Sequence, residues 1–211
     1  KFRFMNKKIL VTGGNGLVGS NFKDKKNYVT WGREHCDLRN KYSVEKNMSE
    51  EVFDGVIHAA AKVGGLGGNM NFKGEFFYEN IMINTNVIET ARKTRVENLV
   101  CFLSTCVFPN DVEYPLTEKN IHMGPPHFSN DAYAYAKRMA DIQIRAYREQ
   151  YGLNYKSVIP TNIYGINDNF DIENGHVVPS LIHKCYIARE TNTPLTIWGS
   201  GKPLREFIYN K

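Results

Sequence analysis

Residues 8–19 read KILVTGGNGLVG, an apolar run followed by glycines in the spacing G-x-x-G-x-x-G. This pattern predicts a strand, a tight turn and a helix, an arrangement that binds the pyrophosphate of a dinucleotide. Gly13 permits the turn, Gly16 lets backbone N–H groups approach the phosphates, and Gly19 lets the helix pack against its strand. No Gly-Lys-Ser/Thr follows, which excludes a P-loop of the nucleoside triphosphate type.

The second expected strand indicates which dinucleotide is bound. Residues 27–31 end just before Arg33 and Glu34, where an adenine ribose would lie. An arginine suits a 2′-phosphate and an acidic residue suits the bare ribose hydroxyls, so Arg33 favours NADP while Glu34 leaves NAD open. Asp37 and Leu38 follow in a loop that could contact the adenine, although Asp37 could instead cap the next helix.

Short apolar strands alternate with helical patterns along the chain. The strands are expected near residues 8–12, 27–31, 55–59, 98–104, 155–160 and 194–198. Such alternation is the βαβ signature of an α/β fold with a doubly wound parallel sheet, the Rossmann type. We expect residues 5–165 to form an NADP-binding Rossmann domain. Residues 166–211 are expected to be a mixed segment that contributes a helix to that domain and begins an incomplete substrate domain.

Composition favours a soluble enzyme-sized unit. The 211 residues are 42% hydrophobic, enough to bury a core. No apolar run of about 18 residues exists and no signal peptide opens the chain, so no membrane partner is expected. The net charge of +5 comes from scattered lysines without interleaved aromatic residues, which excludes a nucleic-acid stripe.

The cysteines and histidines suggest a reducing compartment and no metal. The four cysteines, Cys36, Cys101, Cys106 and Cys185, form no C-x-x-C pair. Cytoplasmic localisation is therefore expected. His122 and His127 flank a Met-Gly-Pro-Pro turn, but no further ligands are spaced to complete a tetrahedral site, so they are interpreted as loop histidines.

Residues 133–137, YAYAK, bring a tyrosine and a lysine onto one face of an expected helix. An ammonium near a phenol favours the phenolate, so Lys137 is expected to lower the pKa of Tyr133 toward the working pH. Tyr133 would then give a proton to a carbonyl oxygen while hydride reaches the carbon. Y-x-x-x-K is common on protein surfaces, but the dinucleotide turn in the same chain favours the catalytic interpretation.

Further candidates follow two of the expected strands. Residues 56–65, VIHAAAKVGG, leave their strand with small side chains that allow a cofactor to approach the backbone. His58 within this run is interpreted as a hydrogen-bonded core residue. Ser104 and Cys106 stand where another strand ends, and Ser104 can hydrogen-bond a substrate carbonyl. From its position alone, Cys106 is either a small buried residue or a reactive thiol.

These motifs together resemble extended short-chain dehydrogenase/reductases, and among them enzymes that epimerise and reduce a GDP-bound keto sugar. The matching stretches are TGGNGLVGS (12–20), HAAAKVGG (58–65), LSTCVFP (103–109), GPPH (124–127), YAYAKRM (133–139), VIPTNIYG (158–165), DNFDIENGHVVPSLIHK (168–184) and WGSGKPLREFIY (198–209). So many motifs in one order make the resemblance specific.

The resemblance implies a two-stage reaction on GDP-4-dehydro-6-deoxy-D-mannose. C3 and C5 would be inverted and the C4 ketone then reduced with NADPH, giving GDP-L-fucose. Ser104 and Tyr133 would stabilise the enolate oxygen and Tyr133 would protonate the C4 oxygen. Cys106 matches the family's base and His176 its acid. Lys137 would also hold the nicotinamide ribose.

The resemblance also implies binding residues and a homodimer. Cofactor contacts are expected from Gly13, Gly14, Asn15, Gly16, Leu17, Val18, Gly19, Arg33, Asp37, Leu38, Ala59, Ala60, Ala61, Leu103, Lys137, Pro160, Thr161, Asn162, Ile163 and His176. Contacts with the GDP-sugar are expected from Ser104, Asn162, Lys184, Trp198 and Arg205; a lysine and an arginine suit its diphosphate. The dimer would form through helices near residues 76–95 and 131–151, which carry Phe76, Phe77, Ile83, Met139, Ile142 and Tyr147.

One departure concerns length. Family members continue for roughly another hundred residues beyond the equivalent of Tyr209, and this sequence stops at Lys211. The cofactor site is therefore expected to be complete and the guanine end of the substrate site incomplete. Two alternatives stay open: a related nucleotide-sugar epimerase or dehydratase that retains NAD, and a non-catalytic NADP-binding scaffold, against which the intact catalytic set argues.

Overall fold

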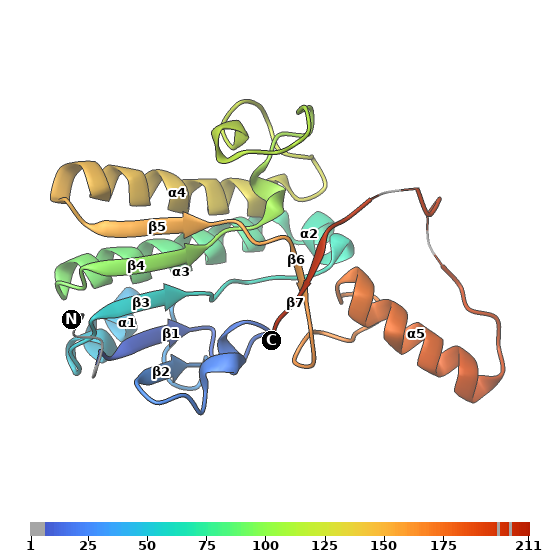
Figure 1. The fold of residues 1–211 in the computed structure, drawn as a ribbon, viewed down its shortest axis with the longest axis horizontal. Helices are drawn as coiled ribbons and strands as arrows, with labels where there is room; N and C mark the ends of the chain where they lie inside the picture. The colour runs from blue at the N-terminus through green and yellow to red at the C-terminus, as the bar shows by residue number, and fades with distance from the viewer. Residues whose placement is uncertain (1–6, 198, 203) are drawn as a thin grey trace, which may run out of the picture.

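The computed structural model describes residues 7–197, 199–202 and 204–211. Its centre is a five-stranded parallel sheet in the order β2-β1-β3-β4-β5 (Figure 1). The strands are β1 (Ile9–Thr12), β2 (Tyr28–Trp31), β3 (Gly55–His58), β4 (Asn98–Phe102) and β5 (Asn154–Val158). Short apolar runs with helical connections fold into such a sheet because each crossover returns the chain parallel to its starting strand. The predicted α/β fold with a doubly wound parallel sheet is confirmed.

Helices connect the strands. They are η1 (Gly19–Phe22), α1 (Lys41–Ser49), α2 (Leu66–Asn71), α3 (Lys73–Lys93), η2 (Thr105–Val107), η3 (Glu118–Asn120), α4 (Asp131–Tyr151) and α5 (Val177–Thr191), where η marks a 3₁₀ helix. The longest, α3 and α4, pack against each other beside the sheet. None of the described helices is long and apolar enough to cross a membrane.

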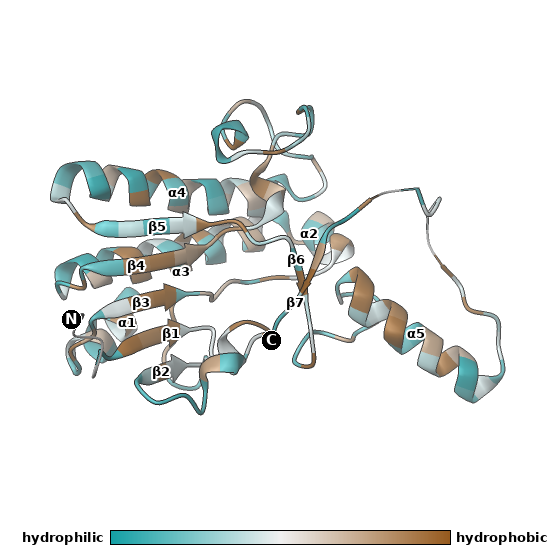
Figure 2. Ribbon diagram, viewed as in Figure 1, coloured by the Kyte–Doolittle hydropathy of each residue, from teal (hydrophilic) through white to brown (hydrophobic). Residues whose placement is uncertain are grey.

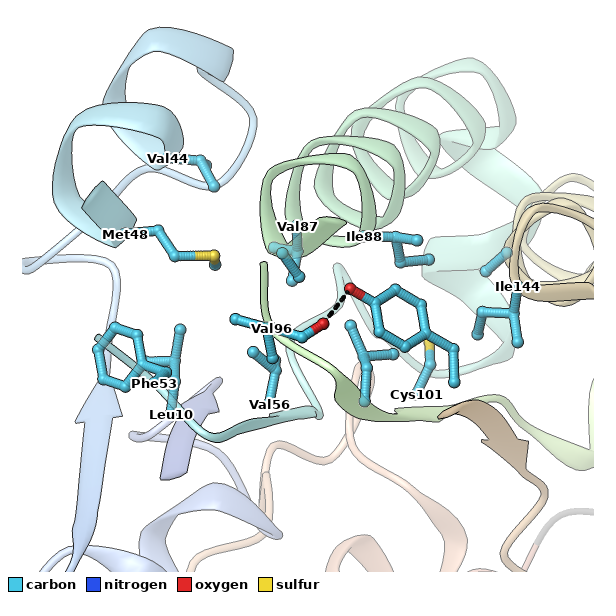
Figure 3. Packing of buried hydrophobic residues seen from close by; sticks show 14 of the residues in the cluster. Leu10, Val44, Met48, Phe53, Val56, Val87, Ile88, Val96, Cys101 and Ile144 are labelled. Atoms are coloured by element: carbon cyan, nitrogen blue, oxygen red, sulfur yellow. Dashed lines mark hydrogen bonds between the residues drawn. The ribbon is translucent and has the colours of Figure 1, made fainter. Parts of the chain in front are cut away.

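The core lies between the sheet and the helices α1, α3 and α4 (Figure 3). Hydrophobic residues gather in β1, β3 and β4 (Figure 2), where Leu10, Val56 and Leu99 are buried. Tyr155 of β5 is also buried, and its hydroxyl donates a hydrogen bond to the Val96 carbonyl at 2.8 Å (Figure 3). This bond satisfies a polar group that would otherwise be costly to bury.

Two predicted elements differ from the structure. The helix expected after the glycines is only the four-residue η1, because β2 begins at Tyr28 and leaves little chain for a longer one. The strand expected at 194–198 does not form at residues 194–197, which are exposed and have no strand beside them among the described residues; residue 198 lies outside the described part. An apolar run without a pairing partner does not make a strand.

A second, small sheet was not predicted. Strand β6 (Asn162–Tyr164) pairs in parallel with β7 (Phe207–Tyr209). Together they lie beyond the carboxyl ends of the main strands, and α5 lies further out on the same side (Figure 1). Asn210, which follows β7, connects the small sheet to the glycine turn after β1, since its side chain donates a hydrogen bond to the Leu17 carbonyl at 3.0 Å.

Candidate active site

A cavity of about 890 Å³ opens at the carboxyl ends of the parallel strands. Its walls come from the glycine turn after β1, the loops after β2, β3 and β4, the start of β6 and the start of α5. Ligands of open α/β sheets bind at this edge, and the volume is typical of a cofactor site. The cavity is thus the candidate active site.

The glycine turn forms one wall of the cavity, and its geometry explains the glycines. Gly13 has a φ of +77°, and a Cβ there would come within 2.9 Å of the Ala60 backbone. A Cβ on Gly19 would collide with the Gly13 carbonyl oxygen. Leu17 and Val18 line the cavity, and no acceptor among the described residues bonds their backbone N–H groups. These N–H groups, rather than a helix dipole, suit a pyrophosphate, since η1 is too short for an appreciable macrodipole.

Charged side chains surround the end of the cavity beside β2. Arg33 is largely exposed, and its guanidinium stands 3.9 Å from the Glu79 carboxylate. Arg39, which sequence analysis missed, binds Asp37 at 2.8 Å and Glu79 at 3.1 Å. The Glu34 carboxylate accepts a hydrogen bond from the Asn15 side chain at 2.8 Å and lies 3.0 Å from the His35 ring. Two guanidinium groups therefore lie where the predicted 2′-phosphate would bind.

Asp37 does not cap α1. Asn40 precedes the helix, and its side chain accepts a hydrogen bond from the Ser43 backbone N–H at 3.2 Å. Asp37 instead accepts bonds from the Arg39 guanidinium, which hold the pKa of the Asp37 carboxyl below its usual range. The alternative in which Asp37 caps the helix is therefore wrong.

The tyrosine and lysine of α4 line the cavity near the carboxyl end of β4. Tyr133, Lys137 and Ser104 all line it, and the Ser104 side chain is near enough to affect the pKa of Tyr133. Lys137 is 1% exposed, and its Nζ donates to the Phe102 carbonyl at 2.8 Å. The predicted arrangement of these three side chains around one pocket is present.

The predicted lowering of the Tyr133 pKa is wrong for this structure. Burial raises the pKa of Tyr133, and the nearby thiols of Cys106 and Cys101 raise it further, while the Ser104 side chain opposes them weakly. Burial also lowers the pKa of Lys137, and its ammonium points to the Phe102 carbonyl. Desolvation of the phenolate outweighs any attraction to the lysine here.

Cys106 lies in η2, two residues after Ser104. It is half-buried and is not among the residues that line the cavity. Burial raises the pKa of its thiol. The side chain of Asn130 donates to its Sγ at 3.0 Å, a contact that sequence analysis missed because the two residues come from different segments.

His176 stands directly before α5 and lines the cavity. Its Nδ1 lies 3.3 Å from Asp168, and this carboxylate raises the pKa of His176 above its ordinary value. The Asp168 side chain is buried, and its Oδ2 has no hydrogen-bond partner among the described groups. A protonated imidazole suits an acid, and Asp168 is the partner that the sequence motif did not reveal.

The remaining predicted residues divide between the cavity and its surroundings. All expected cofactor residues line the cavity except Gly14, whose N–H donates to the Trp31 carbonyl at 2.8 Å. Asn162 also lines it, whereas Lys184 lines a separate hollow of about 270 Å³ beside α5. Arg205 is exposed and does not line the cavity. Trp198 lies outside the described residues.

Two histidine interpretations can be compared with the structure. His58 is fully buried between Thr12 at 2.7 Å and Asn84 at 3.1 Å, and burial lowers its pKa to about 3. It is therefore a neutral core residue, as predicted. His122 binds Asp141 of α4 at 3.0 Å, and His127 binds the Ser129 hydroxyl in the loop before α4 at 2.7 Å, so both have hydrogen-bond partners.

The chain belongs to the NAD dependent epimerase/dehydratase family, whose model matches residues 9–211. Within this class it is similar to GDP-L-fucose synthases. The enzyme of Dictyostelium discoideum is 50% identical over 210 residues, covering 96% of this chain and 66% of the relative. A probable GDP-L-fucose synthase of Drosophila melanogaster is 41% identical, covering 97% of this chain and 68% of the relative.

A solved structure shares the fold. The GDP-L-fucose synthetase of Naegleria fowleri bound to NADP matches with a TM-score of 0.88 and 46% identity, over 97% of this chain and 69% of that chain. This chain thus spans about two thirds of the length of the proteins it matches.

Proposed function

We propose that this protein supplies the cofactor site and the catalytic groups of a GDP-L-fucose synthase, which epimerises GDP-4-dehydro-6-deoxy-D-mannose at C3 and C5 and reduces C4 with NADPH. The observation that carries the proposal is the convergence of Ser104, Tyr133, Lys137 and His176 on one cavity beside a dinucleotide turn. The similarity to GDP-L-fucose synthases supports it.

NADP is the cofactor that the residues fit. The backbone N–H groups of Leu17 and Val18, which bond no acceptor among the described residues, suit the pyrophosphate. The Arg33 guanidinium suits the 2′-phosphate. The related synthetase of Naegleria fowleri is bound to NADP. When bound, NADPH supplies the hydride; the protein positions it and provides the protons.

Each side chain then has a defined task. Protons next to the sugar ketone become removable when donors stabilise the enolate oxygen, and the hydroxyls of Ser104 and Tyr133 are such donors. Cys106 removes a proton on one face and His176, whose pKa is raised by Asp168, returns one on the other. Tyr133 finally protonates the C4 oxygen, for which its raised pKa keeps the phenol in the proton-bearing form.

The two halves of the reaction can be separated by mutation in the full-length protein. In Cys106→Ser, deuterium incorporation from solvent at C3 and C5 should collapse, because a hydroxyl is a far weaker base than a thiolate, while NADPH binding is retained. In Tyr133→Phe, NADPH consumption should fall on the order of 100-fold or more. Exchange at the unmutated rate in Cys106→Ser would assign the base to another residue.

An unmutated protein that retains its cofactor through turnover would favour the NAD-retaining epimerase alternative, and one that binds NADPH without any turnover would favour a scaffold.

We further propose a homodimer through α3 and α4. Both helices expose apolar side chains: Phe77 and Tyr78 on α3, and Tyr135, Met139 and Ile142 on α4. Such neighbouring exposed residues are typical of an interface. Light scattering at micromolar concentration should give the dimer mass, and a monomer there would contradict the proposal.

Part of the expected dimer set packs inward instead. Phe76 and Ile83 are buried, and Tyr147 packs against the core and donates to the Glu89 carboxylate at 2.7 Å. The proposed interface therefore uses the outward-facing members of the set. A matched pair of variants, Met139→Glu on the exposed face and Lys156→Glu on β5, should disrupt the dimer only in the first.

The division into domains and the location are proposals as well. We assign residues 5–165 to the NADP-binding domain and 166–211 to a mixed segment that contributes a helix to it and begins the substrate region. This assignment is consistent with α5 and β7 lying beyond the main strands. The four free cysteines fit a cytoplasmic location. Fractionation of cells that express the full-length protein would test this location.

A further inference from the structure

Asn130 contacts Cys106 but has no role in the reaction proposed above. Its side-chain Nδ2 donates to the Cys106 Sγ at 3.0 Å. A hydrogen-bond donor at a sulfur favours the anion over the neutral thiol. We propose that Asn130 is a positioning residue that holds the Cys106 sulfur and favours its thiolate, so that it governs the epimerisation half of the proposed reaction and leaves the reduction half intact. This inference rests on the proposed function.

The Asn130 side chain does not perform the role that its place in the sequence suggests. It stands directly before α4, where asparagine usually accepts a hydrogen bond from the first turn of the helix. Here the side chain makes no such cap bond. Its Oδ1 is buried without a hydrogen-bond partner in the described part of the chain. The side chain is therefore committed to the sulfur at some cost in free energy, which points to a role other than helix stability.

The surroundings of Cys106 make this donor important. Reactive thiolates are usually stabilised by a neighbouring lysine, arginine or histidine. Among the described residues no such cation shifts the pKa of Cys106. Tyr133 on α4 is near enough for the thiol to raise its pKa, and within the loop the Cys106 backbone N–H donates to the Ser104 hydroxyl oxygen at 3.4 Å. Asn130 is therefore the donor that reaches the sulfur from outside the loop.

Arg138 fixes the geometry of the pair. Its buried guanidinium donates to the Val107 carbonyl at 2.8 Å and to the Gly124 carbonyl at 2.7 Å. The first bond holds η2, which carries Cys106, against α4, and the second holds the loop that leads to Asn130. Both partners of the N–H···S contact are thus anchored to one side chain.

The direct test measures the pKa of Cys106 through the pH dependence of its alkylation by iodoacetamide, resolved by peptide mass spectrometry. Asn130→Asp keeps the shape, and aspartate is a good residue before a helix. Its carboxylate should slow alkylation of Cys106 at neutral pH by about tenfold or more. Asn130→Ala should shift the pKa in the same direction by less. The exposed Cys185 serves as an internal control in every sample.

Asp131→Asn is the matched control, because it also changes one charge at the start of α4 but its carboxylate binds Lys73 at 2.8 Å. The Cys106 pKa should not change in this variant. An unchanged pKa in Asn130→Ala would overturn the proposal, and a lowered one would show that the amide oxygen faces the sulfur and favours the thiol. Thermal unfolding of each variant confirms that it is folded.

Activity provides the second readout in the full-length protein. Asn130→Ala should reduce deuterium incorporation at C3 and C5 about tenfold while the NADPH affinity stays the same. Equal losses in exchange and NADPH affinity would indicate a merely structural role and overturn the proposal. If the unmutated protein exchanged no protons of the keto sugar, the proposed function would fail, but the alkylation result would still decide whether Asn130 favours the thiolate.

Discussion

Arg33 should give the protein its preference for NADPH over NADH. Its side chain is 72% exposed and its nearest carboxylate, Glu79, is 3.9 Å away, so its guanidinium can turn to a phosphate without breaking a strong pair. A charge-assisted hydrogen bond contributes about 1.5–3 kcal/mol, and exposure to solvent reduces this to about 1–2 kcal/mol. Arg33→Ala should therefore weaken NADPH binding roughly 5- to 30-fold.

Arg39 provides the matched comparison. It is 34% exposed and already binds Asp37 through two of its nitrogens, at 2.9 and 2.8 Å, and Glu79 at 3.1 Å. A phosphate would have to compete with these carboxylates, so Arg39→Ala should weaken NADPH binding less than Arg33→Ala. NADH lacks the 2′-phosphate, and its affinity should be nearly unchanged in both variants.

Isothermal titration calorimetry of both cofactors against the unmutated protein and the two variants measures these differences. The preference should also shrink as ionic strength rises, because the arginine is exposed. Equal affinities of the unmutated protein for NADPH and NADH would refute the assignment of the phosphate site. A preference that survives Arg33→Ala and disappears in Arg39→Ala would move the site to Arg39.

Two further predictions concern titrating pairs. Asp168→Asn should lower the pKa of His176 toward its ordinary value, since the carboxylate raises it, and ¹H–¹⁵N NMR titration of the imidazole should show this shift; an unchanged pKa would remove Asp168 from the site. Arg92 and the Tyr147 hydroxyl lower the pKa of Glu89 to about 2 in the folded protein. The Glu89 carboxylate therefore stabilises the fold fully at pH values above its unfolded-state pKa, and this stabilisation is lost as the pH falls through about 2. Glu89→Gln should cost about 1–2 kcal/mol in urea unfolding at pH 7 and less near pH 3, the surface position limiting the effect; an equal loss at both pH values would contradict the assignment.

The main sheet and the glycine turn could be predicted because their signals are local. Apolar runs such as residues 8–12 and 98–102 form strands wherever the chain can return beside them, and the spacing of Gly13 and Gly19 is dictated by backbone contacts within one turn. The pairing of β6 with β7 could not be predicted in this way. It joins segments more than forty residues apart in the chain, as the Asn162 to Glu206 hydrogen bond shows.

The candidate site was also predictable only in part: its motif residues could be identified from the sequence, but their contacts could not. Motifs identified Cys106 and His176, but not the side chains that bind them, Asn130 and Asp168. Those contacts depend on how loops approach each other, which periodicity does not encode. The pKa of Tyr133 was mispredicted for a related reason, because helix spacing indicated a neighbouring lysine but not the extent of burial.

The titration of Tyr133 and Cys106 connects the two halves of the proposed reaction. A negative charge on the Cys106 sulfur raises the pKa of Tyr133, in addition to the effect of burial. While Cys106 is a thiolate ready to remove a sugar proton, the phenol of Tyr133 is held in its protonated form and can stabilise the enolate oxygen. The same proton remains available for the C4 oxygen when hydride arrives.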